Sequence, residues 1–168
     1  MNKEPWKELH RYWLLKHRDG QPPSRKDLDP LIEIPSLVAN LVLLTLEGGS
    51  YRYTLVGTEV VKRAGVDMTG QMIGLTITAP EMRDQWRAAL DMVAREQTPQ
   101  LFLSKMPEGV TARYVTIMLP LVAPSGNTEK ILAGCSSMAM SRRASGSPDC
   151  RRSISTRNGG SRFPIAKD

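Results

Sequence analysis

The chain has 168 residues and a net charge of +6 at pH 7, from 23 Lys and Arg against 17 Asp and Glu. That length corresponds to one domain that can bury a core of its own. With 40% hydrophobic and 24% charged residues, the composition is that of a globular protein and excludes a fibrous or wholly disordered chain.

The first predicted element is an amphipathic helix over residues 4–18, ended by Gly20. Its apolar positions Trp6, Leu9 and Trp13 recur at helical spacing. Two tryptophans on so short a helix must be covered, either by the domain's own sheet or by a second subunit. These three residues are therefore the candidate interface of a homodimer.

A proline-rich segment follows, in which Pro30 and Pro35 limit any helix to a few residues. Ser24 and Asp27 have the three-residue spacing of a helix N-cap. Residues 38–46 and 50–56 then have the Val, Leu and Tyr content of strands, and Glu-Gly-Gly between them predicts a hairpin.

The second half begins with a short helical stretch over 58–64 and an irregular connection. Residues 80–95 give the clearest helix, with an apolar stripe that includes Trp86 and Leu90. Three strands are predicted next, over 100–106, 112–122 and 129–140, separated by Pro- and Gly-containing turns.

This order predicts an α+β domain with a five-stranded antiparallel sheet, because short connections make neighbouring strands antiparallel. The short helices between the second and third strands should cover one face of the sheet. The amphipathic helix precedes the sheet at the N-terminus.

A ligand pocket is one interpretation of the space between the long helix and the sheet. Nine methionines against two phenylalanines suggest an adaptable interior that leaves room for a small apolar ligand. A closed core is the other interpretation. The candidate pocket residues are Tyr53, Met68, Met82, Trp86, Leu90, Phe102 and Met118.

Residues with catalytic or metal-binding chemistry are sparse. His10 and His17 lie seven residues apart on one predicted helix, too far apart to hold one metal ion directly. Cys135 lies in an apolar strand pattern and is interpreted as a small buried side chain. The sequence therefore predicts a non-enzymatic protein without catalytic or metal-binding residues, and it identifies no cofactor.

The basic character is concentrated in residues 141–168. Seven of the 23 basic and two of the 17 acidic residues lie there, so this segment carries +5 of the net charge and residues 1–140 only +1. Its few apolar residues predict a disordered tail after a domain over 1–140. Such a tail supports an alternative function, the binding of nucleic acid or another acidic surface. The near-neutral domain argues against sequence-specific recognition of nucleic acid.

The cellular compartment is predicted from the N-terminal residues, the longest apolar run and the cysteines. Charges stand where a secretion signal needs an apolar stretch. The longest apolar run, 37–46, is about half of the ~20 residues that cross a membrane. Cys135 and Cys150 form no spaced motif, which fits a reducing compartment. We expect a cytoplasmic protein without a membrane segment.

Three stretches resemble a PAS-like family found in many alphaproteobacterial proteins. They are residues 24–30 (SRKDLDP) with 34–35 (IP), residues 51–58 (YRYTLVGT) and residues 67–70 (DMTG). The resemblance covers about residues 5–138 and implies a PAS fold, but it carries over no residue role. It implies a sensory or regulatory module of bacterial signalling that binds a partner protein and, with the candidate pocket, a small apolar ligand.

Overall fold

The computed structural model describes residues 4–74, 80–105 and 113–138. Its helices are α1 (Pro5–Leu15), η1 (Arg25–Asp27), α2 (Pro30–Glu33), η2 (Pro35–Asn40), α3 (Thr58–Ala64) and α4 (Pro80–Glu96). Its strands are β1 (Leu41–Glu47), β2 (Ser50–Val56), β3 (Gln100–Lys105), β4 (Arg113–Val122) and β5 (Thr128–Met138). The predicted tail over 141–168 lies outside the described residues.

The five strands form one antiparallel sheet in the order β2-β1-β5-β4-β3. The β1–β2 hairpin and the β3–β4–β5 meander are joined by pairing of β1 with β5 in the middle of the sheet. The predicted fold class is confirmed. The ends of two predicted strands, at residues 106 and 139–140, lie outside the described residues, as does residue 112.

Two element boundaries were predicted wrongly. Residues 38–40 belong to the 3-10 helix η2 and not to a strand, because Pro35 begins a helical turn that ends only at Asn40. Helix α1 ends at Leu15 and not at residue 18, because the chain reverses at once through Asp19 and Gly20, both with positive φ. The α4 helix agrees within one residue.

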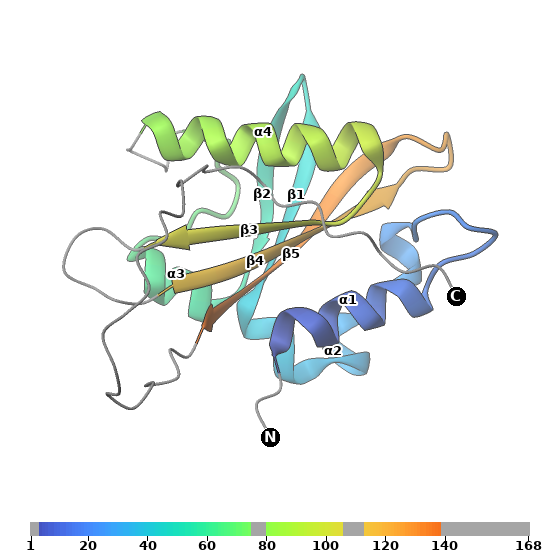
Figure 1. Ribbon diagram of the computed structural model, residues 1–168, viewed down its shortest axis with the longest axis horizontal. Coiled ribbons are helices and arrows are strands. Elements are labelled where there is room, and N and C mark those ends of the chain that lie inside the picture. Colours follow the sequence, from blue (N-terminus) through green and yellow to red (C-terminus); the bar gives the residue numbers. More distant parts are fainter. Residues whose placement is uncertain (1–3, 75–79, 106–112, 139–168) are drawn as a thin grey trace, which may run out of the picture.

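Helices cover both faces of the sheet (Figure 1). On one face, here called the α1 face, α1 and the proline-rich segment bury a first core, and on the other, the α4 face, α4 and α3 bury a second. The first core contains Leu9, Tyr12, Trp13, Leu28, Ile34, Leu37, Leu41, Leu43, Ile117, Leu119, Leu121 and Leu132. The second contains Val42, Leu44, Tyr51, Tyr53, Val60, Ile73, Leu90, Val93, Met118, Ile131 and Ala133.

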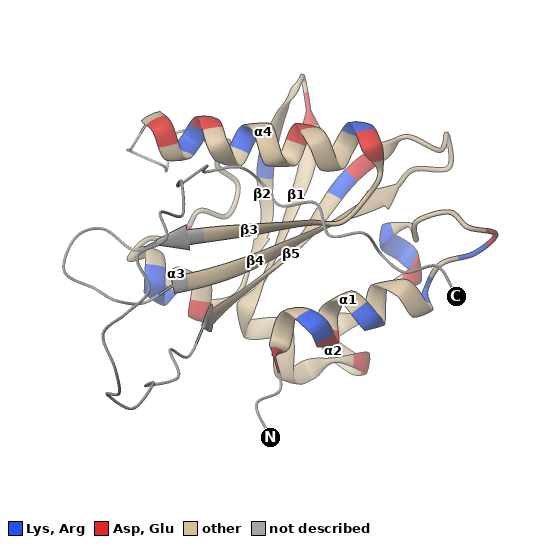
Figure 2. Cartoon of the chain, in the orientation of Figure 1, with Lys and Arg blue, Asp and Glu red and all other residues tan. Residues whose placement is uncertain are grey.

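Charges are mixed along the helices. Lys and Arg alternate with Asp and Glu on both α1 and α4 (Figure 2). In the part of the chain that the structure describes, no helix has both the length and the apolar character needed to cross a bilayer.

Candidate ligand site beneath α4

The α4 face carries small side chains at one end of the central strands. Strand register places Phe102, Thr116 and Cys135 side by side in one row across β3, β4 and β5. Because side chains two residues apart share a face, Ala133 and Ser137 flank Cys135 on the same face of β5. Large side chains at the far end of β5, such as Ile131, thus give way to Ala, Cys and Ser toward α3.

The middle and the second half of α4 are fixed firmly above the sheet. Leu90 and Val93 are completely buried. The Tyr51 hydroxyl donates a hydrogen bond to Asp91 Oδ1 at 2.7 Å, and Arg87 donates one to the Gly49 carbonyl at 2.7 Å in the β1–β2 hairpin. Burial, followed by the Asp91 carboxylate, raises the pKa of Tyr51, so this phenol remains a donor at neutral pH.

The first half of α4 is packed less tightly. Trp86 and Phe102 are half-buried, with ring centroids 5.2 Å apart, and both lie against the second core rather than inside it. Met68, from the connection after α3, is also half-buried there. Aromatic rings and a flexible thioether at such a border provide adaptable apolar contact surface.

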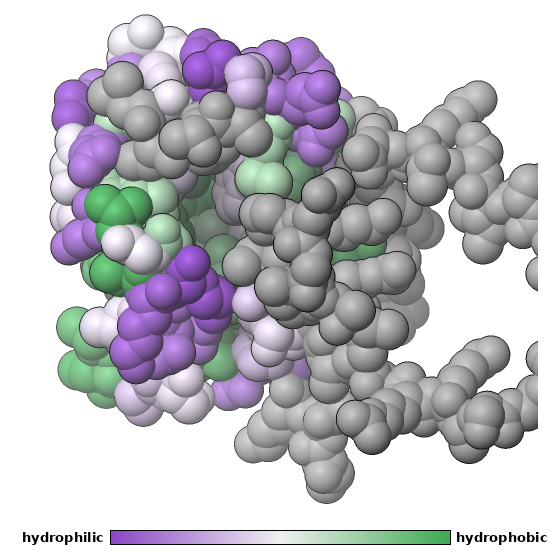
Figure 3. Space-filling model, turned by 90° about the vertical axis from the view of Figure 1, so that its left-hand side faces the viewer, coloured by the Kyte–Doolittle hydropathy of each residue, from purple (hydrophilic) through white to green (hydrophobic). Residues whose placement is uncertain are grey.

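A recess opens where the small row meets the loosely packed end of α4. The space-filling view toward α3 and the start of α4 shows the hollow between these two helices, with hydrophobic side chains inside it (Figure 3). We call this hollow the recess.

The polar groups of the recess are Thr116 and Cys135. The Thr116 hydroxyl, which is buried, donates a hydrogen bond to Cys135 Sγ at 3.3 Å. Burial raises the pKa of the Cys135 thiol, although Thr116 and the nearby Arg63 oppose that effect. The thiol is therefore neutral at pH 7 and behaves as a small apolar surface with weak polar character.

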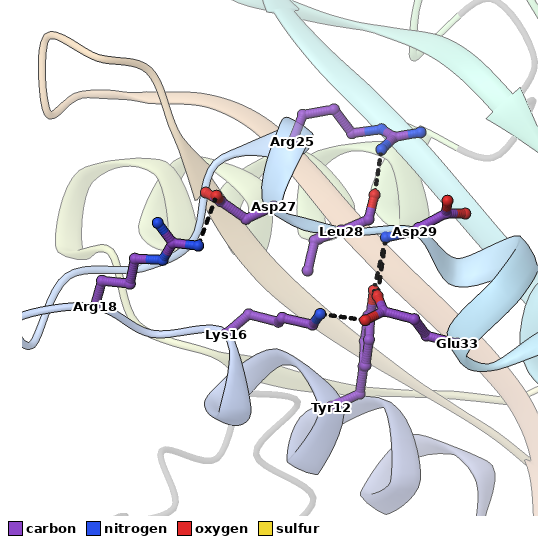
Figure 4. A network of polar contacts seen from close by, with 8 residues as sticks. All are labelled: Tyr12, Lys16, Arg18, Arg25, Asp27, Leu28, Asp29 and Glu33. Carbon is purple, nitrogen blue, oxygen red and sulfur yellow. Dashed lines mark hydrogen bonds and ion pairs between the residues drawn. The ribbon is translucent and has the colours of Figure 1, made fainter.

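On the α1 face, by contrast, a network of polar contacts connects α1 and the residue after it with α2 and the residue before it. The Tyr12 hydroxyl donates to Glu33 Oε2 at 2.5 Å and accepts from the Asp29 N–H at 2.9 Å, and Lys16 pairs with the same Glu33 (Figure 4). Lys16, Tyr12 and the Asp29 N–H lower the pKa of Glu33 to about 2. Burial, with Glu33, raises the pKa of Tyr12.

Two further contacts in Figure 4 shape the proline-rich segment. Arg18 pairs with Asp27 at 3.7 Å, and Arg25 donates to the Leu28 carbonyl at 2.8 Å. The predicted cap is present, since the Ser24 N–H and hydroxyl both donate to Asp27 Oδ2, at 2.9 and 2.6 Å. Asp27 therefore caps the turn that begins at Ser24 and also pairs with Arg18, just beyond the end of α1.

A small cavity lies at the edge of the α1 face. A gap of about 10 Å³ is lined by Pro5, Trp6, Leu9, Leu37, Asn40, Leu41, Gly134, Cys135 and Ser136. A single water molecule needs at least that much space, so this cavity has no room for an organic ligand.

The structure brings most of the predicted pocket residues together. Tyr53, Leu90 and Met118 are buried in the second core, and Met68, Trp86 and Phe102 pack against it. Met82 is half-buried in the first turn of α4 and does not join this cluster. Sequence reasoning missed Thr116, and it placed Cys135 in the core without linking it to the pocket.

The predicted interface residues pack against the sheet of their own chain. Leu9 and Trp13 are each 1% exposed against the chain's own sheet, and Trp13 Nε1–H donates to the Pro120 carbonyl at 2.9 Å. Trp6 packs against the same core and is half-buried. Of the two coverings considered for this helix, the structure provides the domain's own sheet.

The two histidines do not converge on a metal site. His17 Nδ1 lies 3.1 Å from the Trp13 carbonyl, and burial followed by the charge of His17 lowers the pKa of His10. Among residues 4–74, 80–105 and 113–138, no three His, Cys, Asp or Glu side chains are placed to hold a metal ion together.

Comparison with known proteins gives the family. A model of the PAS domain matches residues 1–136. The chain belongs to the PAS domain family. Comparison with curated proteins finds no match.

Two solved structures that are similar to this PAS domain are the following. The PAS domain of BvgS from Bordetella pertussis is 17% identical, with 66% of this chain and 88% of that chain covered and a TM-score of 0.50. A LOV protein from Rhodobacter sphaeroides is 10% identical, with 82% and 70% covered and a TM-score of 0.47. PAS domains are typically sensory or signalling modules rather than catalysts, and this chain shares their five-stranded sheet.

Proposed function

We propose that this PAS domain is a sensory or regulatory module that binds a small apolar ligand in the recess and transmits its occupancy to a protein partner. The observation that carries the proposal is the row of small side chains at Thr116 and Cys135 beneath the loosely packed half of α4. Apolar walls with a few polar groups are typical of small-molecule sites.

Movement of α4 is the expected response to binding of the ligand. The helix is anchored from Arg87 onward, by Arg87 itself and by the bond of Tyr51 to Asp91, whereas Met82 and Trp86 nearer its start are half-buried. A ligand beneath Trp86 would add contacts to this half-buried ring, and it would stabilise the folded state by mass action. The start of α4 is then the element whose position depends on occupancy.

The ligand part is tested with N-phenyl-1-naphthylamine, a neutral apolar dye that fluoresces on binding. We expect the wild-type protein to bind the dye and Cys135→Phe, which fills the recess, to weaken binding at least 10-fold. Leu103→Phe is the matched control, since Leu103 is 66% exposed at the edge strand β3. Equal dye binding by wild type and Cys135→Phe, with circular dichroism showing both folded, would contradict the recess as the site.

A second copy of this chain is the partner that the surface favours. Leu15, Leu31 and Ile32 are 71–78% exposed on α1 and α2, which the Lys16–Glu33 pair holds together. Exposed apolar side chains on adjoining helices favour association. Light scattering should report a dimer for the wild type and a monomer for Leu15→Glu with Ile32→Glu, while Leu103→Glu stays dimeric. A wild-type monomer, or a dimer unaffected by the double change, would exclude this surface.

The basic tail remains the basis of the alternative function. Residues 141–168 carry +5, and nucleic acid binding through them would weaken steeply with salt. Removal of these residues separates the two proposals, because dye binding in the recess should survive and any binding of nucleic acid should be lost.

A further inference from the structure

Arg63, on α3, lies at the end of the recess where the small row terminates. Its Nη1 donates a hydrogen bond to Asn40 Oδ1 at 3.0 Å, and its guanidinium lies 5.4 Å from the centre of the Tyr114 ring. Tyr114 faces α4, as Thr116 does two residues along β4. The guanidinium is also close enough for its charge to act on Cys135. These contacts place a cation beside the polar end of the recess.

Arg63 forms no direct ion pair within the described part of the chain. The charges of Glu59 and Arg63 act on each other along α3, but the Glu59 carboxylate contacts Lys62, at 2.6 Å. Its Nη2 is buried and has no acceptor among the described residues. A buried guanidinium nitrogen without an acceptor costs free energy, so an acceptor supplied by a ligand would be stabilising.

Resting on the ligand site proposed above, we propose that the recess takes a small carboxylic acid whose apolar chain lies along Trp86 and Phe102 and whose carboxylate pairs with Arg63. A guanidinium presents parallel N–H donors that match the two oxygens of a carboxylate. Because Asn40 holds Nη1 and the Tyr114 ring supports the guanidinium face, the side chain is positioned before the ligand arrives. The carboxylate of the ligand and its apolar chain are thus recognised by different side chains.

The closing experiment compares octanoate with octan-1-ol, two probes with the same apolar chain and different heads, by titration calorimetry on the full chain. We expect octanoate to bind at least 10-fold more tightly than octanol to the wild type. Arg63→Met should abolish that preference and leave octanol binding within about 2-fold.

Lys62→Met is the matched control. It removes the same charge from the neighbouring position of α3, but the Lys62 side chain is 71% exposed and points to solvent. The preference for octanoate should persist in this variant. Thermal unfolding checks that all variants are folded, and Arg63→Lys, which keeps the charge without the paired donors, should retain an intermediate preference.

The outcomes separate this inference from the function on which it rests. Equal binding of octanoate and octanol to the wild type, or a preference that survives Arg63→Met, overturns the carboxylate site while the apolar recess stands. Failure of both probes to bind the wild type overturns the ligand recess itself. A preference lost equally in Lys62→Met and Arg63→Met would show only long-range charge attraction and would also overturn the inference.

Discussion

The two faces of one sheet are packed in opposite ways. On the α1 face, Gly134 provides the space into which Leu9 packs, since a Cβ at that position would lie 2.4 Å from Leu9 Cδ2. On the α4 face, the neighbouring Cys135 packs against the second core together with the half-buried Trp86. The close approach of a helix is therefore shown at Gly134 on the α1 face, whereas the side chains at the border of the second core are less completely buried.

The difference has consequences for stability and for function. The α1 face combines apolar burial with the Tyr12–Glu33–Lys16 network, so it holds the fold together. On the α4 face, polar contacts hold α4 at Arg87 and Asp91, whereas Met82 and Trp86 nearer its start are half-buried. The four predictions below test this contrast, beginning with the largest expected effect.

Removal of a tryptophan should cost much more on the α1 face. Trp13→Ala deletes a ring that is 1% exposed and loses the hydrogen bond to Pro120, so we expect a loss of about 3–5 kcal/mol in the free energy of unfolding. Trp86→Ala should cost about 1–2 kcal/mol because the ring is half-buried. Urea unfolding measures both, and equal losses would contradict the contrast between the faces.

A larger side chain at Gly134 should lower the free energy of unfolding. Gly134→Ala places a methyl group against Leu9, so we expect a loss of about 1–3 kcal/mol in the free energy of unfolding. The same change in a Leu9→Ala background should cost far less, because the clash is gone. A double-mutant cycle measures this coupling, and additive losses would show that α1 does not pack into the space above Gly134.

The anchor of α4 should make a smaller contribution. Tyr51→Phe removes only the hydrogen bond to Asp91, and we expect a loss of about 1 kcal/mol in the free energy of unfolding. Hydrogen exchange should increase in the second half of α4 more than in α1. If exchange increases equally in both helices, α4 is not an independently anchored element.

The smallest effect is the acid sensitivity of the α1 face. The pKa of Glu33 is lowered to about 2 from an ordinary value of 4.5, so its contribution to stability is present above pH 4.5 and is lost as the pH falls through about 2. Thermal unfolding of Glu33→Gln should therefore depend less on pH across this window than that of the wild type. Lys16→Met removes the largest cause of the shift and should also weaken the dependence, and unchanged curves in both variants would exclude the pair as a stabilising contact.

Much of the fold follows from local patterns. The hairpin around Gly48 and Gly49, the short α3 ended by Gly65 and the apolar stripe of α4 could each be predicted because turn residues and periodicity act within a few residues. The helical conformation of residues 38–40 could not be predicted in this way. An apolar run suits a 3-10 turn as well as a strand, and only the packing of η2 distinguishes them.

The candidate site was predictable only in part. Trp86, Phe102 and Tyr53 stand on the correct faces of their elements, which periodicity shows directly. Arg63 carried no such signal, because a cation on a short exposed helix is ordinary until Asn40 and Tyr114 are found beside it. Thr116 and Cys135 could be joined only once the register of β4 against β5 was known.

By itself, the sequence determined which segments become helices and strands and which of their side chains are apolar. It also determined that the basic charge is concentrated in residues 141–168, away from a nearly neutral domain. Tertiary structure alone decided that Leu9 fills the space at Gly134 and that Thr116 and Cys135 are hydrogen-bonded neighbours across β4 and β5. The physical reason is that periodicity is a property of neighbours along the chain, whereas a recess depends on how closely two distant elements can approach.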